Sequence, residues 1–502
     1  MQQTADPLSA ADRGVVRMRV TRNDRWYPLV HIAARAGWIN DPNGLVHLSG
    51  RYHVYFQHNP FGSQWGLMHW GHVSSADLVH WRHEPIALAP ELEAESDGVF
   101  SGSAVALPDR HGIAVLYTGH RWLAPGLARQ VQCLATSTDA TTFVRHGVVI
   151  EPPEQMTDFR DPKVWRTGNR WYLVLGASPL DPADGRRHAE VWLYSSDLQG
   201  PGALRRWRFE GVLYRSPIDE VFMAECPDFF PLGDRWVLSY CAMGTHPHGY
   251  LDRNVNNARY VVGEWAPGRA FTPVTGEFPC DWGHSYYAPQ TMQSPDGRRL
   301  VWGWMGSFGR PEPVAQSDGW CGQLTVPREL DLGPGDAVLT RPVRELTALR
   351  RSTCGLGPIT VPANTERSLA ADIPGAAEIE LSLDLAHSDA ERITLAVHRT
   401  PDGHQTLVVW DGQSGRGHLD RGSSGAGDRG SRSAPCAPDA DGLLRLRIVL
   451  DRGSVEVFVG DGDQVISSMV YPPEGPRAAA ICAECGDARI TALRIHHLDA
   501  IF

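Results

Sequence analysis

Three acidic residues stand at nearly the same distance before three segments rich in aromatic and β-branched residues. The distance is 11, 10 and 11 residues, for Asp41 before Tyr52, Asp161 before Trp171 and Glu225 before Trp236. Three carboxyl groups in one place can divide the work of breaking a glycosidic bond: one attacks as a nucleophile, one protonates the leaving oxygen and one holds hydroxyl groups. The spacing therefore indicates glycoside hydrolysis, if the fold brings the three acids together.

Each acid also has a structural explanation. Asp41 and Asp161 precede prolines, and the run Asn-Asp-Pro-Asn-Gly at 40–44 predicts a turn directly after Asp41. Glu225 is flanked by Phe, Met, Ala and Cys, which are uncommon at a surface turn. Apolar surroundings disfavour the charged form of a glutamate, which suits a general acid. Because the three acids lie at nearly the same distance before their aromatic runs, we interpret them as one site. The turn after Asp41 would then hold that residue at the edge of the site.

Side chains suited to a sugar pocket lie at neighbouring positions. They are Trp38, Asn40, Gln57, Trp65, Phe100, Ser101 and Arg160. Aromatic rings stack on sugar faces, and amide or guanidinium groups bind hydroxyl groups. Taken one at a time, the three aromatic residues are more simply explained as core.

A repeat of about 60 residues is expected to position these side chains. Strand-like runs, each after a turn signal, begin at Tyr52, Ile113, Trp171, Trp236 and Leu300, which are 61, 58, 65 and 64 residues apart. Each run follows a shorter strand-like segment, and helical periodicity is nearly absent. This pattern predicts an all-β fold with a five-bladed β-propeller, whose innermost strands line a central channel. An irregular β-sandwich with accidental spacing is the alternative. In a propeller, acids in one phase converge at one mouth of the channel.

The pattern changes after residue 330. Alternating strands such as 377–385 and 444–450 predict a C-terminal β-sandwich. We expect an N-terminal extension at 1–27, the propeller at 28–340, a linker at 341–358 and the sandwich at 359–502. The Gly/Ser/Asp-rich stretch 412–442 is expected to form a long exposed loop.

Composition narrows the class of partner. The 502 residues carry a formal net charge of −11, which argues against nucleic acid or an anionic membrane as the main partner. We expect a cytoplasmic protein, because no leader or membrane-spanning run is recognisable; a mature secreted chain whose leader had been removed would look the same. The nine cysteines are expected to be mostly reduced and buried. We expect no metal site at Cys482 and Cys485, or at His69 and His72, because no further ligands stand nearby.

A set of motifs resembles a known family. WINDPNG (38–44), NPFGSQWGLMHWGH (59–72), FSGSAV (100–105), FRDPKVW (159–165) and ECPDFF (225–230) resemble the β-fructofuranosidases of glycoside hydrolase family 32, which includes invertases, sucrose-6-phosphate hydrolases, levanases and inulinases. The segment 319–330 resembles the family's propeller exit, and 453–462 resembles a strand pair of its sandwich. Two positions depart from the family pattern: His58 stands where tyrosine is usual, and Ser285 stands where aspartate is usual.

The resemblance implies a role for each acid. Asp41 is expected to attack the anomeric C2 of a fructosyl unit, Glu225 to act as acid and then as base, and Asp161 to bind ring hydroxyls and stabilise the transition state. Retention of configuration then predicts Asp41 and Glu225 carboxyl groups about 5–5.5 Å apart. Cys226 joins the expected substrate-binding residues, and no metal or organic cofactor is implied. Ser285 leaves the leaving-group preference open.

We therefore expect release of terminal β-D-fructofuranosyl units, from sucrose or short fructo-oligosaccharides. Alternatives are transfer of the fructosyl unit to another sugar, exo-hydrolysis of levan or inulin, and a non-catalytic sugar-binding propeller. The sequence leaves open whether the substrate carries a phosphate. It also leaves open whether the sandwich only supports the propeller or forms the face of a homodimer.

Overall fold

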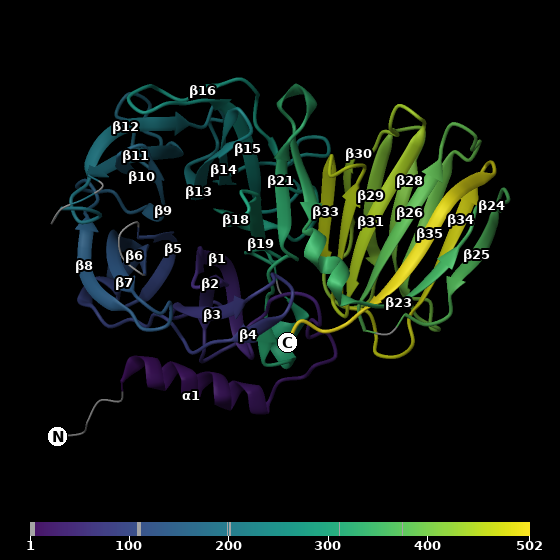
Figure 1. Ribbon diagram of the computed structural model, residues 1–502, viewed down its shortest axis with the longest axis horizontal. Helices are drawn as coiled ribbons and strands as arrows, with labels where there is room; N and C mark the ends of the chain where they lie inside the picture. The colour runs from purple at the N-terminus through teal and green to yellow at the C-terminus, as the bar shows by residue number, and fades with distance from the viewer. Residues whose placement is uncertain (1–5, 108–111, 198, 200–201, 311, 374) are drawn as a thin grey trace.

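The computed structural model describes residues 6–107, 112–197, 199, 202–310, 312–373 and 375–502. Within these ranges the chain consists mainly of strands, which form two parts lying side by side (Figure 1). The predicted all-β class is confirmed. The turn expected before Ile113 falls partly outside the described residues.

The first part contains five sheets within the described ranges, each built from strands that follow one another along the chain. The first sheet consists of β1 (Gly37–Leu48), β2 (Arg51–Asn59), β3 (His69–Ser75) and β4 (Trp81–His83), joined by β20 (Trp320–Cys321). The second consists of β5 (Gly98–Ala106), β6 (Ile113–Ala124), β7 (Leu127–Ser137) and β8 (Val144–Ile150), and the third of β9 (Phe159–Thr167), β10 (Arg170–Ala177), β11 (Glu190–Asp197) and β12 (Arg208–Arg215). The fourth consists of β13 (Met223–Leu232), β14 (Arg235–Met243), β15 (Asn256–Glu264), β16 (Thr272–Pro273) and β17 (Phe278–Pro279), and the fifth of β18 (Tyr287–Gln293), β19 (Arg299–Trp304), β21 (Arg328–Leu332) and β22 (Val338–Pro342).

The first strand of each sheet lies innermost. Strands β1, β5, β9, β13 and β18 each contact the next, and β18 contacts β1, so the five sheets form a closed ring (Figure 1). The five aromatic runs of the repeat are the second strands, β2, β6, β10, β14 and β19, as their composition predicts. The three acids lie on innermost strands: Asp41 on β1, Asp161 on β9 and Glu225 on β13.

Every innermost strand shifts its register at an equivalent point. The shifts lie between Ile39 and Pro42, between Val99 and Gly102, opposite Val174 to Gly176, between Glu225 and Asp228, and between Tyr287 and Gln290. A bulge of this kind redirects the side chains around it. The turn predicted at 42–44 is wrong: these residues stay within β1. A bulged strand accommodates a proline and, at Gly44, a φ of 53°, so the turn signals mark two bulges instead.

The second part contains two sheets in the described ranges. One consists of β23 (Arg350–Leu356), β24 (Ile359–Val361), β26 (Ala377–Asp384), β31 (Leu443–Asp451), β32 (Ser454–Val459), β33 (Gln464–Met469) and β35 (Ala488–Leu498). The other consists of β25 (Thr365–Ala370), β27 (Arg392–Arg399), β28 (Gln405–Asp411), β29 (Arg416–Ser423), β30 (Ser431–Pro435) and β34 (Ala478–Glu484). Both sheets contribute to a single apolar core.

Two expectations for this part are wrong. The expected linker contains β23, which pairs with β35. The expected loop at 412–442 contains β29 and β30, which pair with each other. The inward positions of β29 include Gly417, Leu419 and Arg421, all buried. A glycine and an arginine at inward positions hide the alternation of a half-buried strand from the sequence.

The helices are few and short. They are α1 (Pro7–Val20) and α2 (Pro313–Ser317), with 3-10 turns at Glu93–Glu95, Pro334–Asp336 and Arg344–Leu349. Helix α1 is capped by Asp6, whose carboxylate accepts from the backbone N–H of Ser9 (3.2 Å), and its Gly14 lies against Phe61 in the connection between β2 and β3. None of the helices in the described residues has the length and apolarity needed to cross a membrane.

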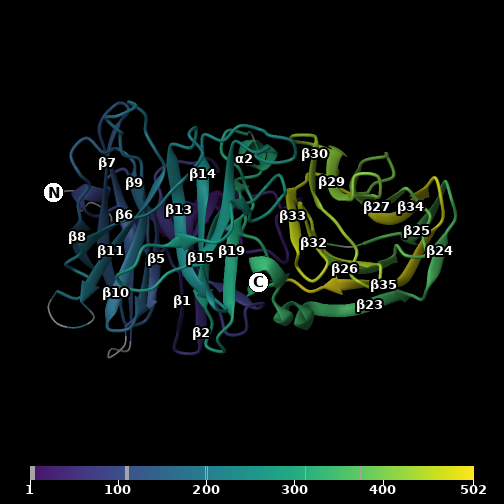
Figure 2. The ribbon, with the colours of Figure 1, turned by 90° about the horizontal axis from the view of Figure 1, so that it is seen from above.

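Buried charges join the two parts, which stand against each other along β33 (Figure 2). Arg328 donates to Asp281 (3.0 Å) and to Glu456. The ring of His31 lies 2.8 Å from Asp451 and 2.8 Å from Glu456, and all five of these side chains are fully buried. Burial alone would lower the pKa of His31, but its two carboxylate partners raise it to about 9. The histidine is therefore a cation at neutral pH.

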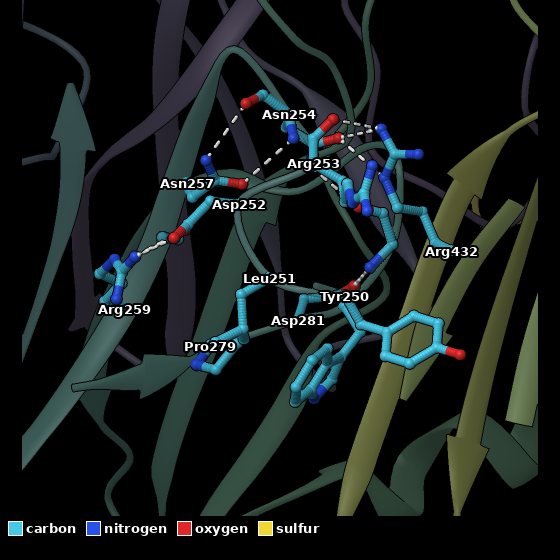
Figure 3. Close-up of a pocket in the computed structure, with 13 residues that line it drawn as sticks. Tyr250, Leu251, Asp252, Arg253, Asn254, Asn257, Arg259, Pro279, Asp281 and Arg432 are labelled. Carbon is cyan, nitrogen blue, oxygen red and sulfur yellow. Dashed lines mark hydrogen bonds and ion pairs between the residues drawn. The ribbon is translucent and has the colours of Figure 1, made fainter. Parts of the chain in front are cut away.

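A small polar pocket lies beside this junction (Figure 3). On its wall Arg259 pairs with Asp252 (2.6 Å). Arg432, from the second part, donates to the side-chain oxygen of Asn254 (2.9 Å) and to the carbonyl of Arg253 (2.6 Å). The three acids do not line this pocket, and these polar groups serve to attach the loop between β14 and β15 to the second part.

Candidate active site

Asp41 is held by donors from two strands. Its Oδ1 accepts from the side-chain amide of Asn40 (2.9 Å), and its Oδ2 accepts from the hydroxyl of Ser101 on β5 (2.6 Å). The indole N–H of Trp38 donates to Oδ1 of Asn40 (2.7 Å), which orients that amide toward Asp41. The carboxylate is thus fixed in position while its residue remains 8% exposed.

A single cysteine links Asp41 to Asp161. The Sγ of Cys226 lies 3.4 Å from Oδ2 of Asp41 and 3.6 Å from Oδ2 of Asp161. The backbone N–H of Cys226 also donates to Oδ2 of Asp161 (2.9 Å). Asp161 and Cys226 sit at the bulges with φ of 67° and 48°, in the left-handed region. The bulges therefore turn two acids, 120 residues apart in sequence, toward one thiol.

Glu225 completes the group. Arg160 donates to its Oε1 (2.9 Å) and lies with Nε 3.8 Å from Oδ2 of Asp161, so one guanidinium serves two acids. The hydroxyl of Tyr287 on β18 donates to Oε2 of Glu225. The Glu225 side chain is 16% exposed, against 6% for Asp161, so it is the more open to a leaving group or to water.

Burial dominates the electrostatics of the site. It raises the pKa of Asp41, against the hydrogen bonds from Ser101 and Asn40, and the nearby Glu225 adds to the rise. Burial also raises the pKa of Asp161 to about 7, although Arg160 opposes this shift. Burial thus favours the protonated forms of Asp41 and Asp161, as expected where acids divide between proton transfer and attack.

Four of the eight predicted substrate-binding residues contact the acids directly. They are Asn40, Ser101, Arg160 and Cys226. Gln57 is buried and donates to the carbonyl of Val99 (3.0 Å). Trp65, between β2 and β3, is 45% exposed and meets the ring of Phe100 edge-on at 6.0 Å. Phe100 directly precedes Ser101 on β5, so this ring pair lies next to a residue that binds Asp41.

Sequence reasoning missed two contributors. Tyr287 lies 13 residues before Leu300, against 10 or 11 for the acids, so the repeat spacing does not mark it. Lys163 donates to Asp228 (2.8 Å) and to the carbonyl of Thr291 (2.5 Å), which ties β9, β13 and β18 together below the acids. The sequence signal for the pair of Lys163 and Asp228 is a lysine within a strand, two residues after Asp161.

The histidines considered as metal ligands have other partners. The Nδ1 of His69 contacts the carbonyl of Leu67 (2.9 Å), and Nε2 of His72 contacts Nδ1 of His53 (3.0 Å). Of the residues described, Asp181, Asp184 and His188 are close enough together to share a metal ion. Their groups are already engaged, because Asp184 contacts His188 and Asp181 pairs with an arginine.

The two departures from the family pattern are also placed. His58 is buried, with Nδ1 2.7 Å from the carbonyl of Trp38. The hydroxyl of Ser285 accepts from the backbone N–H of Met469 on β33 (3.1 Å). The backbone N–H of Ser285 donates to the carbonyl of Ser467 (3.0 Å). The Ser285 side chain therefore binds the second part of the protein.

The chain matches two models of one glycosidase family. Residues 31–342 match the model of the glycosyl hydrolases family 32 N-terminal domain, and residues 345–497 match that of the family 32 C terminal. The chain belongs to glycoside hydrolase family 32. It is thus a glycoside hydrolase, as the three carboxylates indicate.

Named relatives of this family 32 chain extend over almost its whole length. A sucrose-6-phosphate hydrolase from Escherichia coli is 41% identical over 97% of the chain and 98% of the relative. A raffinose invertase from Escherichia coli is 40% identical over 96% and 98%. The structure of the family 32 β-fructofuranosidase of Bombyx mori is similar with a TM-score of 0.85 and 30% identity, covering 100% of this chain and 99% of that one.

Proposed function

We propose that this family 32 chain releases the terminal β-D-fructofuranosyl unit of sucrose with retention of configuration. The observation that carries the proposal is the linked group of Asp41, Asp161 and Glu225 on three innermost strands. Sucrose 6-phosphate and raffinose, the substrates in the names of two relatives, both contain a sucrose unit. That shared unit is the reason for choosing sucrose.

In this proposal Asp41 attacks the anomeric carbon. Asn40 and Ser101 hold the carboxylate in one orientation, so little reorganisation precedes attack. Glu225 protonates the departing glycosidic oxygen as Asp41 bonds to C2. It then takes a proton from the water that attacks C2, which breaks the bond to Asp41 and releases fructose. Its greater exposure supports that exchange of protons.

Asp161 and Arg160 bind the fructosyl hydroxyls in this scheme. Both lie at the bulge of β9, within reach of the group formed by Asp41, Cys226 and Glu225. Negative charge there stabilises positive charge that develops at the anomeric carbon in the transition state. The carboxyl separation of about 5–5.5 Å between Asp41 and Glu225 stays a prediction.

The architecture forms part of the proposal. We infer that the five sheets are the blades of a five-bladed β-propeller, at about 28–340, and that the second part is a β-sandwich that starts near β23. We also place the enzyme in the cytoplasm. All nine cysteines are free and six of them are buried, which suits a reducing compartment.

Fructose release tests the proposal. The purified chain is incubated with sucrose, sucrose 6-phosphate, raffinose, 1-kestose, inulin and levan, and fructose is measured over time. We expect kcat/KM to be higher on sucrose, sucrose 6-phosphate and raffinose, in which the terminal fructosyl unit is linked to glucose, than on the polymers. In methanol–water mixtures, transfer should yield the β-methyl fructofuranoside, because retention follows from two displacements. Absence of fructose from every substrate, or an α product, would contradict the proposal.

A further inference from the structure

The hairpin of β6 and β7 extends past the end of β5. His120 pairs with Gly98 at the end of β5 that carries Ser101, the partner of Asp41. Beyond His120 the hairpin continues to Ala124 before it turns back. Its tip exposes three large apolar side chains: Trp122 (49% exposed), Leu123 (51%) and Leu127 (45%).

An aromatic row connects this tip to the site. Trp65 meets Phe100 edge-on at 6.0 Å, and Phe100 stacks on His120 with ring centroids 4.2 Å apart and planes 6° from parallel. His120 in turn meets Trp122 at 4.8 Å with planes 89° apart. His120 is buried and Phe100 is partly buried, whereas the outer two residues are half exposed, so the row has solvent-facing rings at both ends.

The row is tied to the acids at its centre. Nε2 of Gln130 lies 3.4 Å from Nδ1 of His120, and Oε1 of Gln130 accepts from Arg160 (3.2 Å), the residue that binds Glu225. The other ring nitrogen of His120, Nε2, is buried and has no hydrogen-bond partner among the described residues. Burial, and then Arg160, lower the pKa of His120 to about 4, so the ring is neutral and stacks as an uncharged aromatic.

Trp122 has support at its backbone and at its ring, although the residue is half exposed. Its backbone N–H donates to Asp97 (2.9 Å), and the buried His120 ring supports its indole from behind. A half-exposed indole that is fixed in this way is preorganised to bind a ligand with apolar C–H faces. A hexose released from a fructoside has such a face and carries no charge.

We propose that Trp122 forms a binding platform for the leaving-group sugar, as the outer end of the row Trp65–Phe100–His120–Trp122. The inference rests on the proposed function, because it assumes that fructosides are cleaved beside Asp41. It assigns to the hairpin tip the recognition of the sugars beyond the scissile bond. Leu123 follows Trp122 at a register shift of the hairpin and carries no ring, so it has no part in the platform.

Three substrates that differ only in leaving group test this inference: methyl β-D-fructofuranoside, sucrose and raffinose. For Trp122→Ala we expect kcat/KM to fall about three- to tenfold on sucrose and at least as much on raffinose, a range set by the strength of one aromatic contact. Activity on the methyl fructoside should stay unchanged, and Trp122→Phe should restore most of the loss. Leu123→Ala, equally exposed on the same tip, is the matched control and should match the parent on all three.

The outcomes separate the explanations. An equal loss on all three substrates would mean that Trp122 only supports Phe100 and the site, and it would overturn the inference. Unchanged activity on sucrose and raffinose would overturn it as well. If the parent enzyme releases fructose from none of the three, the proposed function itself fails and the inference falls with it. A thermal unfolding curve for Trp122→Ala that matches the parent excludes general misfolding.

Discussion

Replacing Asp41 by asparagine should abolish turnover and leave the fold intact. In the variant the remaining oxygen can still accept from Asn40, while the new amide replaces the oxygen that faces Ser101 and Cys226. The Ser101 hydroxyl can rotate from donor to acceptor, so the substitution loses at most about one neutral hydrogen bond, worth about 1 kcal/mol.

A second effect opposes this loss. Burial and the neighbouring Glu225 raise the pKa of Asp41, so the ionised carboxylate destabilises the folded state at neutral pH. Asparagine removes that charge. We therefore expect the free energy of unfolding of Asp41→Asn to lie within about 1 kcal/mol of the parent or above it. Loss of the nucleophile should reduce kcat on sucrose at least about 10,000-fold.

Fructose release and urea unfolding, measured on the same preparation, check both expectations. Asp139→Asn is the matched control, since Asp139 is an acid of the first part that accepts from Thr141 (2.8 Å) and Thr142 (2.7 Å) in a turn on the β7–β8 connection. Asparagine can accept there too, so turnover should not change. Residual turnover of Asp41→Asn within tenfold of the parent would refute the nucleophile assignment. A stability loss above about 3 kcal/mol would show that Asp41 holds the fold.

Three further substitutions probe the buried charges. The pKa of Asp161, raised from 3.8 to about 7, means that the folded state binds the extra proton, so its contribution to stability is lost as pH rises from about 4 to 7. In Asp161→Asn the midpoint of urea unfolding should no longer include this fall between about pH 4 and 7. For His31, whose pKa is raised from 6.5 to about 9, stability is fully present below 6.5 and is lost as pH rises through 9. His31→Gln should remove that slope and cost about 3–5 kcal/mol at pH 6, measured by urea unfolding between pH 6 and 10. Lys163→Met leaves Asp228 buried without its cation and should cost about 3–5 kcal/mol in thermal or urea unfolding, most of which a second change, Asp228→Asn, should restore.

Much of this protein could be predicted from local sequence because its architecture repeats. Aromatic and β-branched runs at intervals of about 60 residues identify the second strand of each sheet, and acids in one phase identify which strands carry the site. The position of a strand within its repeat also determines how close that strand lies to the centre of the ring. The sequence therefore predicted that Asp41, Asp161 and Glu225 would lie on innermost strands.

Local signals failed where pairing with a neighbouring strand decided the backbone. Pro42 and Gly44 have the residue types of a turn, yet pairing with β2 keeps them in a bulged strand. The stretch 412–442 has the composition of a loop, yet pairing between β28, β29 and β30 makes it part of a sheet. In both places tertiary contacts outweigh weak local preference.

Only the tertiary structure decided which side chains contact the three acids. The thiol of Cys226 meets Asp41 across 185 residues of sequence, Arg160 reaches Glu225 across 65, and Tyr287 reaches Glu225 across 62. No local pattern records such pairings, because they arise when separate sheets close into a ring and each bulge redirects a side chain toward its axis. The sequence alone determined the chemistry available and the strands that carry it. The closing of the ring buried Asp41 and Asp161 beside the thiol of Cys226 and left Glu225 more open to solvent.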